Sequence, residues 1–158
     1  MYDPIADWKR EAVESEGRSF PETMLLPLAE AVKVRQRIFS AIGLSPGASN
    51  REALDSLYAC AQRLTQNPQM IDGVAIEKVL EEAQVRSESL LLVFPLGSAF
   101  ESAVRIARAD FVAFFDDLWY PSTDDLVVID AANHVLLLVD HHENIGTLRL
   151  GEEHPGRA

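Results

Sequence analysis

Two short acidic segments near the C-terminal end of the chain carry the residue types that could do chemistry. The first is Asp-Asp-Leu-Trp-Tyr-Pro-Ser-Thr-Asp-Asp at residues 116–125, in which two pairs of aspartates flank an aromatic pair. The second is Asp-His-His-Glu at residues 140–143. Carboxylates and imidazoles attract cations, ligate metals and transfer protons. We therefore weigh partner binding, metal binding and acid–base catalysis.

The first segment favours binding of another protein. Trp and Tyr are frequent interface anchors because they bury much area with little loss of entropy. Carboxylates around them select a partner with exposed Lys or Arg and speed the encounter. In the alternative, Trp119 is a core residue and the aspartates form turns and caps. The candidate partner-binding residues in this segment are Asp116, Asp117, Trp119, Tyr120, Asp124 and Asp125.

The second segment invites a metal interpretation, which its spacing weakens. Neighbouring side chains on a strand point to opposite faces, so His141 and His142 share an ion only if a turn bends between them. The sequence has no His-Glu-x-x-His motif to supply a helical ligand pair. We expect no metal and no cofactor, and a pH-sensitive turn stays open because His titrates near neutrality. Asp140, His141, His142 and Glu143 are therefore also counted as partner-binding candidates.

Acid–base catalysis by paired carboxylates is known in hydrolases, but the sequence does not specify it. Nothing identifies which aspartate would be desolvated, and residues 110–148 contain no Lys or Arg to bind an anionic substrate. No nucleophile elbow, phosphate loop or dinucleotide fingerprint is present. We predict no catalytic residues and no enzyme. A metal-dependent or carboxylate-based hydrolase that uses these loops is the alternative.

The acidic charge of the chain is concentrated around the two segments. Residues 110–148 hold eight carboxylates and no Lys or Arg, which is −8 of the formal net charge of −11. A pI near 4.7 argues against nucleic-acid binding because phosphates would be repelled. The charge favours a basic partner, or in a third interpretation it serves only the solubility of a structural or regulatory protein.

Length and composition predict one domain over residues 1–150. A chain of 158 residues buries roughly 70% of its unfolded surface and needs no disulfide or metal to hold a core. The single cysteine excludes an internal disulfide. No apolar run reaches the roughly 20 residues that cross a bilayer, and the acidic N-terminus lacks a signal-peptide core. These features predict a cytoplasmic protein without membrane contact.

Residues 1–85 read as the helical part of this domain. We expect a helix over residues 3–15 that ends at Gly17, and a capped helix start at residues 19–22. Pro27 predicts a kink or a fresh start before a helix that ends near Gly43. A capping box at residues 49–52 and a cap at Asp72 predict two further helices. The expected inward positions are Leu28, Val32, Phe39 and Ile42, then Leu54, Leu57, Tyr58, Ala61 and Leu64, and then Ile76, Val79, Leu80 and Ala83.

Residues 86–150 read as a mixed part. The apolar run at 90–94 predicts a strand covered on both faces. A capping box at residues 98–101 predicts a helix with Phe100, Ala103, Val104 and Ala107 together. Phe111 and Phe114 extend this face or start a strand, and we favour the helix. Runs at 126–130, 134–140 and 145–150 predict an antiparallel meander, with Asn133 in the first turn. We expect an α+β fold in which N-terminal helices pack on a mostly antiparallel sheet of about four strands, with residues 151–158 as a disordered tail.

The run Asp-Leu-Trp-Tyr-Pro-Ser-Thr-Asp-Asp at 117–125, followed by strands and a His-containing turn, resembles a motif of small bacterial immunity proteins. These proteins belong to contact-dependent inhibition and polymorphic-toxin systems. The resemblance covers residues 86–150. It implies a non-enzymatic acidic protein that binds and neutralises a cognate toxin, often a basic nuclease. The residues that match its motif are Asp117, Trp119, Tyr120, Asp124 and Asp125.

Overall fold

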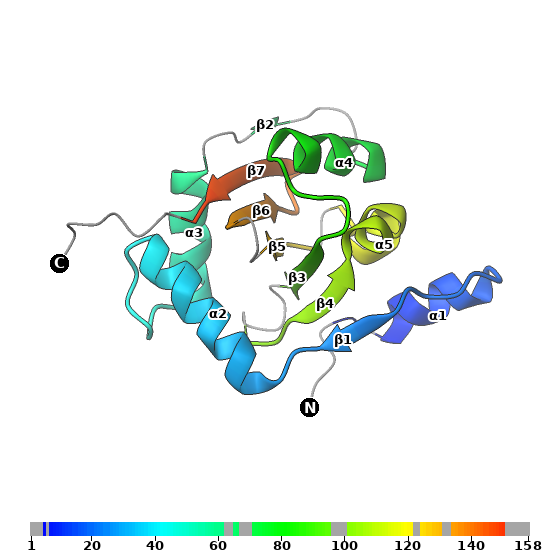
Figure 1. The fold of residues 1–158 in the computed structure, drawn as a ribbon, viewed down its shortest axis with the longest axis horizontal. Coiled ribbons are helices and arrows are strands. Elements are labelled where there is room, and N and C mark those ends of the chain that lie inside the picture. The colour runs from blue at the N-terminus through cyan, green and yellow to red at the C-terminus, as the bar shows by residue number, and fades with distance from the viewer. Residues whose placement is uncertain are drawn as a thin grey trace.

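The computed structural model describes residues 5, 7–61, 65–66, 71–95, 101–121, 124–130 and 134–150. Within these residues the chain forms six helices and seven strands (Figure 1). In chain order they are α1 (Asp7–Ser15), β1 (Thr23–Leu25), α2 (Leu28–Ala41), α3 (Asn50–Cys60), β2 (Thr65–Gln66), α4 (Gly73–Glu82), β3 (Leu90–Pro95), β4 (Val104–Ala107), α5 (Arg108–Ala113), α6 (Phe115–Leu118), β5 (Leu126–Asp130), β6 (Val135–Val139) and β7 (Asn144–Arg149).

All seven strands belong to one antiparallel sheet with the order β1-β4-β3-β5-β6-β7-β2. The α+β class is confirmed, although the sheet has more strands than the expected four. The meander of β5, β6 and β7 is confirmed, with Val128 opposite Leu137 and Leu137 opposite Thr147. The earlier strand β3 joins this meander by pairing with β5, as expected.

Helices cover both faces of the sheet, so the molecule has three layers (Figure 1). Strand residues alternate between two cores because successive side chains point to opposite faces. In β5, Val128 packs with α4, α5 and α6, whereas Val127 packs with α2 and α3. This double coverage explains why β3, β5 and β6 are continuous apolar runs rather than alternating ones.

The predicted helix starts at Ser49 and Asp72 are confirmed. The Ser49 side chain accepts the Glu52 N–H and the Glu52 carboxylate accepts the Ser49 N–H, which completes a capping box. Asp72 Oδ1 accepts the Ala75 N–H at 2.9 Å. The fresh start after Pro27 is also confirmed, because α2 begins at Leu28.

Two sequence predictions about α2 and its neighbourhood are wrong in detail. Leu28 and Val32 are 59% and 36% exposed, and the buried side chains of α2 are Ala31, Ile38 and Phe39. No helix begins at residues 19–22, where the chain instead extends into β1. With β1 and β2, the first 85 residues are not purely helical.

The helix predicted after residue 98 is also wrong over residues 101–107. Residues 104–107 form β4, which pairs with β1 on one side and with β3 on the other. Val104 and Ile106 are buried and Arg105 is half-buried, which is the two-residue period of a strand. The prediction of helix at Phe111 is confirmed by α5. Predictions that concern Leu64, Phe100, Asn133 and residues 151–158 lie outside the described residues.

Two buried cations differ in how they are satisfied. Lys9 is 8% exposed, and its Nζ donates to the Leu118 carbonyl at 2.8 Å and to Asp124 Oδ2 at 2.6 Å. Arg108 is 7% exposed, and its Nε and Nη2 have no hydrogen-bond partner in the described part of the chain. A buried charge without partners opposes folding, whereas a paired one is costly to disrupt.

We therefore expect opposite outcomes from two matched substitutions. Lys9→Met should lower the free energy of unfolding by about 2 kcal/mol because Asp124 loses its cation in a partly buried site. Arg108→Met should leave it within about 1 kcal/mol of the parent or raise it, because a desolvated charge is replaced by an apolar side chain. Urea unfolding of both variants measures the difference. A loss in Arg108→Met as large as that in Lys9→Met would contradict this account.

Candidate interaction surface

The loop between α6 and β5 is held by Asp124. Its Oδ2 accepts hydrogen bonds from Lys9 Nζ at 2.6 Å and from the Tyr120 N–H at 2.8 Å. Its carbonyl accepts the Trp119 Nε1–H at 2.9 Å. Because Lys9 belongs to α1, one aspartate joins the first helix to a loop that lies 115 positions later in the sequence.

Trp119 is a core residue in the structure. It is 1% exposed and stacks on Phe115 with ring centroids 5.4 Å apart. Its indole N–H is already used by Asp124, so neither its ring nor its donor faces solvent. This placement agrees with the alternative in which Trp119 supports the fold, and it leaves no surface anchor at this position.

Trp8 supplies the exposed aromatic ring instead. It is 53% exposed and lies against Tyr120, with ring centroids 5.0 Å apart and planes inclined by 40°. Lys9 Nζ lies 5.5 Å from the Trp8 centroid and 5.1 Å from that of Tyr120, so a fixed cation supports both rings. No local sequence signal links Trp8 to Tyr120.

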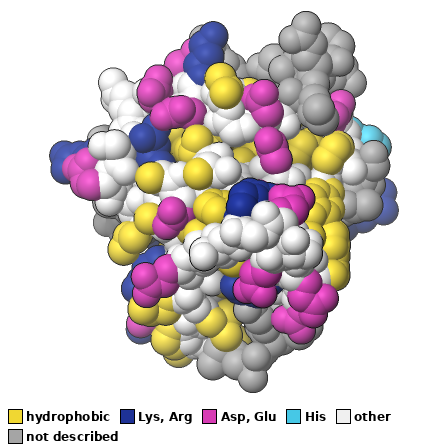
Figure 2. All heavy atoms as spheres, turned by 90° about the vertical axis from the view of Figure 1, so that its right-hand side faces the viewer, with side chains coloured by type: hydrophobic (Ala, Val, Ile, Leu, Met, Phe, Trp, Pro, Cys, Tyr) yellow, Lys and Arg dark blue, Asp and Glu magenta, His cyan; other side chains and the backbone are white. Residues whose placement is uncertain are grey.

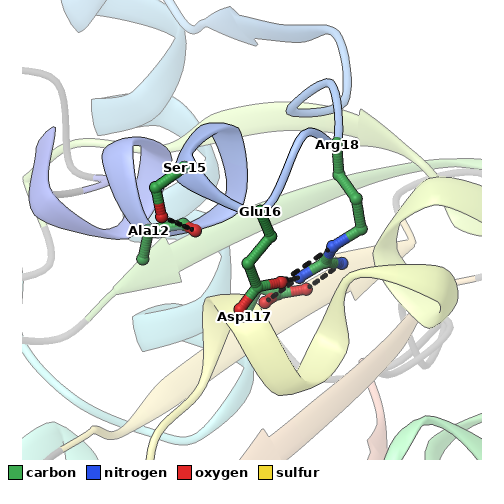
Figure 3. Close-up of polar contacts among 5 residues, drawn as sticks. All are labelled: Ala12, Ser15, Glu16, Arg18 and Asp117. Carbon is green, nitrogen blue, oxygen red and sulfur yellow. Dashed lines mark hydrogen bonds and ion pairs between the residues drawn. The ribbon is translucent and has the colours of Figure 1, made fainter.

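Carboxylates surround this aromatic pair. Burial raises the pKa of the Tyr120 hydroxyl, and the nearby carboxylates of Asp117, Asp124 and Glu16 raise it further. Asp117 and Glu16 both face Arg18, as Figure 3 shows. Hydrogen bonds from Arg18 to Asp117 and then to Glu16 raise the pKa of its guanidinium.

Asp116 extends the acidic region toward α4. It is exposed, yet partial desolvation raises the pKa of its carboxyl, and the neighbouring charges of Asp72 and Asp117 add to the effect. We call the group Trp8, Glu16, Asp116, Asp117 and Tyr120 the aromatic–acidic surface. Figure 2 views the side of the molecule that carries α1 and α5, where Asp and Glu side chains lie among hydrophobic ones.

The second predicted segment lies apart from this surface. Asp125 belongs to the second group, because its Oδ1 accepts a hydrogen bond from the backbone N–H of His141 at 2.8 Å. The same oxygen lies 2.8 Å from His141 Nδ1. The ring of His142 lies 4.0 Å from that of His141. Glu143 has a positive φ of 63° in the same turn. The consecutive Asp124 and Asp125 thus bind different parts of the molecule, helix α1 and the turn after β6.

Asp140 has a structural role in the turn between β6 and β7. It is 6% exposed, and its Oδ1 accepts the N–H groups of His142 and Asn144. The Asn144 side chain donates to its Oδ2 at 2.9 Å. Burial raises the pKa of the nearby Tyr58 hydroxyl, and the charges of Asp140 and Asp125 raise it further.

The structure therefore divides the ten predicted residues. Asp116, Asp117 and Tyr120 share the aromatic–acidic surface, to which the sequence prediction did not assign Trp8 or Glu16. Trp119 and Asp124 lie beneath it as supports. The members of the second group are Asp125, Asp140, His141, His142 and Glu143. Among the described residues, no three His, Cys, Asp or Glu side chains are placed to hold a metal ion.

A cavity beneath α1 adds little chemistry. Its volume is only about 20 Å³, and Lys9 is the one charged residue among those that line it. Its other lining residues are apolar: Ile5, Val93, Pro95, Val104, Ile106, Leu118 and Leu126. A substrate site normally combines an apolar wall with several convergent polar groups, and this lining provides only an amine that is already bonded.

Comparison with protein-family models, with curated proteins and with solved structures gives no significant match to this chain. The helices in the described part of the chain are all too short or too polar to cross a membrane. The function therefore has to be argued from the geometry of the surface.

The raised pKa of Asp116 predicts a pH-dependent cost of its negative charge. The folded state binds this proton more tightly than the unfolded state, so the free energy of unfolding falls as pH rises from the ordinary pKa of 3.8 through the raised one. Asp116→Asn removes that penalty and should be more stable than the parent at neutral pH. The difference should vanish below the ordinary pKa.

Urea unfolding at about pH 7 and about pH 3.5 tests the predicted direction of the stability change, since the two conditions lie on either side of the titration of Asp116. Asp55→Asn is a matched control, because Asp55 is an exposed aspartate on α3 in the opposite helical layer. Equal stability of Asp116→Asn and the parent at neutral pH would show that the carboxylates do not oppose one another.

Proposed function

We propose that this chain is a non-enzymatic acidic protein that binds a basic protein through the aromatic–acidic surface. The observation that carries this proposal is the pair formed by Trp8 and Tyr120, in which a tryptophan that is 53% exposed packs on a tyrosine whose hydroxyl lies near carboxylates. A large ring fixed in advance loses little entropy on binding, which is the property of interface anchors.

The electrostatics support a cationic partner. Partial desolvation raises the pKa of Asp116, and repulsion from the nearby charges of Asp72 and Asp117 raises it further, at a cost to the folded state. A cation from a partner would relieve this repulsion, so part of the penalty becomes binding free energy. A net charge of −11 would also steer a basic partner toward the chain.

Within this class we propose an immunity protein that neutralises a cognate toxin in the cytoplasm, as the resemblance at 117–125 implies. A basic nuclease is the kind of toxin that fits, because carboxylates can take the place of nucleic-acid phosphates. The chain itself would bind neither nucleic acid nor membrane and would need no cofactor.

A hydrolase is the second candidate, and one contact favours it. The 2.8 Å contact between Asp125 Oδ1 and His141 Nδ1 orients the imidazole, as a carboxylate does for a general base. Among the described residues, no hydrogen bond or ion pair joins Asp125 or His141 to a lysine, an arginine or a nucleophilic side chain. Loss of a measured hydrolytic turnover in both Asp125→Asn and His141→Gln would favour this candidate over the binding protein.

The binding proposal predicts loss of protection when the surface is altered. The test co-expresses the chain with the product of the adjacent upstream gene and measures both growth and the Kd of the purified pair. The double substitution Trp8→Ala with Asp116→Lys should weaken binding by about 30-fold or more, because it removes an aromatic anchor and reverses a charge.

Asp55→Lys is the matched control, since it makes the same charge change on α3 and should leave Kd and growth unchanged. Both variants should remain folded, because Trp8, Asp116 and Asp55 are exposed. An unchanged Kd in the double variant would remove the aromatic–acidic surface from the mechanism.

A further inference from the structure

We infer that the aromatic–acidic surface recognises an arginine side chain of its partner, and that Arg18 occupies the arginine site in the free chain. This inference rests on the proposed function and specifies the chemistry of the partner. It goes beyond net charge, because a purely electrostatic surface would accept lysine and arginine alike.

The contacts of Arg18 show what the site accepts. Its Nη1 and Nη2 donate to the two carboxylate oxygens of Asp117 at 3.0 and 2.9 Å, which is a bidentate pair. Its Nε and Nη2 donate to Glu16 Oε2 at 3.1 and 2.6 Å. One planar guanidinium thus serves both carboxylates (Figure 3). The spherical ammonium of lysine cannot reproduce this fork.

An aromatic ring completes the site on its second side. The guanidinium carbon of Arg18 lies 5.6 Å from the centroid of Phe114, within the range of a cation–π contact. Similarly, the guanidinium carbon of Arg10 lies 4.6 Å from the centroid of the neighbouring Phe20 ring. Both arginines thus lie within cation–π distance of a phenylalanine ring, a contact that arginine makes more often than lysine.

The side chain of Arg18 is placed so that it can rotate out of the arginine site into solvent. Its side chain is 42% exposed and that of Glu16 is 62% exposed, whereas Asp117 is 21% exposed. Exposed ion pairs contribute little to stability, so rotation of Arg18 into solvent costs the fold little. Asp117 also lies near the Tyr120 hydroxyl, so an incoming arginine would contact the carboxylates while its neighbours pack on the Trp8–Tyr120 pair.

The test compares a hexa-arginine peptide with a hexa-lysine peptide by isothermal titration calorimetry at low ionic strength. We expect hexa-arginine to bind the parent chain at least about tenfold more tightly than hexa-lysine, because bidentate and stacked contacts are available to it alone. Arg18→Ala should bind hexa-arginine several-fold more tightly than the parent does, because the two carboxylates are vacated. Arg18→Gln is a second variant and should shift affinity in the same direction.

Arg51→Ala is the control for net charge, since Arg51 is an exposed arginine on α3 and its loss changes the charge equally. It should leave the affinity for hexa-arginine unchanged. Equal binding of the two peptides, or unchanged or weaker binding by Arg18→Ala, would overturn the arginine site and leave the proposed function standing. Binding of neither peptide would count against both.

Discussion

The carboxylate of Asp124 is the interaction on which the rest of the candidate site depends. It holds the ammonium of Lys9 from α1 and the backbone N–H of Tyr120 from the loop after α6. The Lys9 ammonium in turn lies near the rings of both Trp8 and Tyr120. A single, largely buried ion pair therefore ties α1 to the loop and places the exposed Trp8 ring beside Tyr120, and removal of either charge would weaken this tie.

This arrangement changes the meaning of the acidic segment. Its charge looked like a surface feature, yet Asp124, Asp125 and Asp140 are used as internal acceptors that shape the loops. Only a few carboxylates are left to face a partner, and these lie close enough to raise the pKa of Asp116. A negative charge that the fold holds at a cost, as at Asp116, is expected where a protein has given up stability for binding.

Sequence patterns predicted the parts of the fold that are governed by local physics. Long apolar runs became β3, β5 and β6, and the side chains of Ser49 and Asp72 capped their helices because capping depends on a few adjacent residues. The strands β1 and β4 were missed because each is short and gains its hydrogen bonds from distant partners. The four residues of β4 were assigned to a helix because the small side chains around them fit a helical spacing as well.

The candidate site was predicted in part for the same reason. Asp116, Asp117 and Tyr120 could be named because they are clustered in the sequence. Trp8 and Glu16 could not, because they reach the loop only through contacts such as that of Lys9 with Asp124, which no local pattern encodes. Trp119 was named as a candidate anchor because a tryptophan in a polar loop looks exposed until the core that receives it is known.

The most direct measurement is a titration of the nitrogen-15-labelled chain with its basic partner, or with an arginine-rich peptide, followed by NMR. The two indole N–H signals report on the two tryptophans separately. The account predicts that the Trp8 indole signal and the amides of residues 116–120 shift on binding, while the hydrogen-bonded Trp119 indole shifts little. Shifts centred on residues 140–145, or spread evenly over every acidic residue, would contradict it.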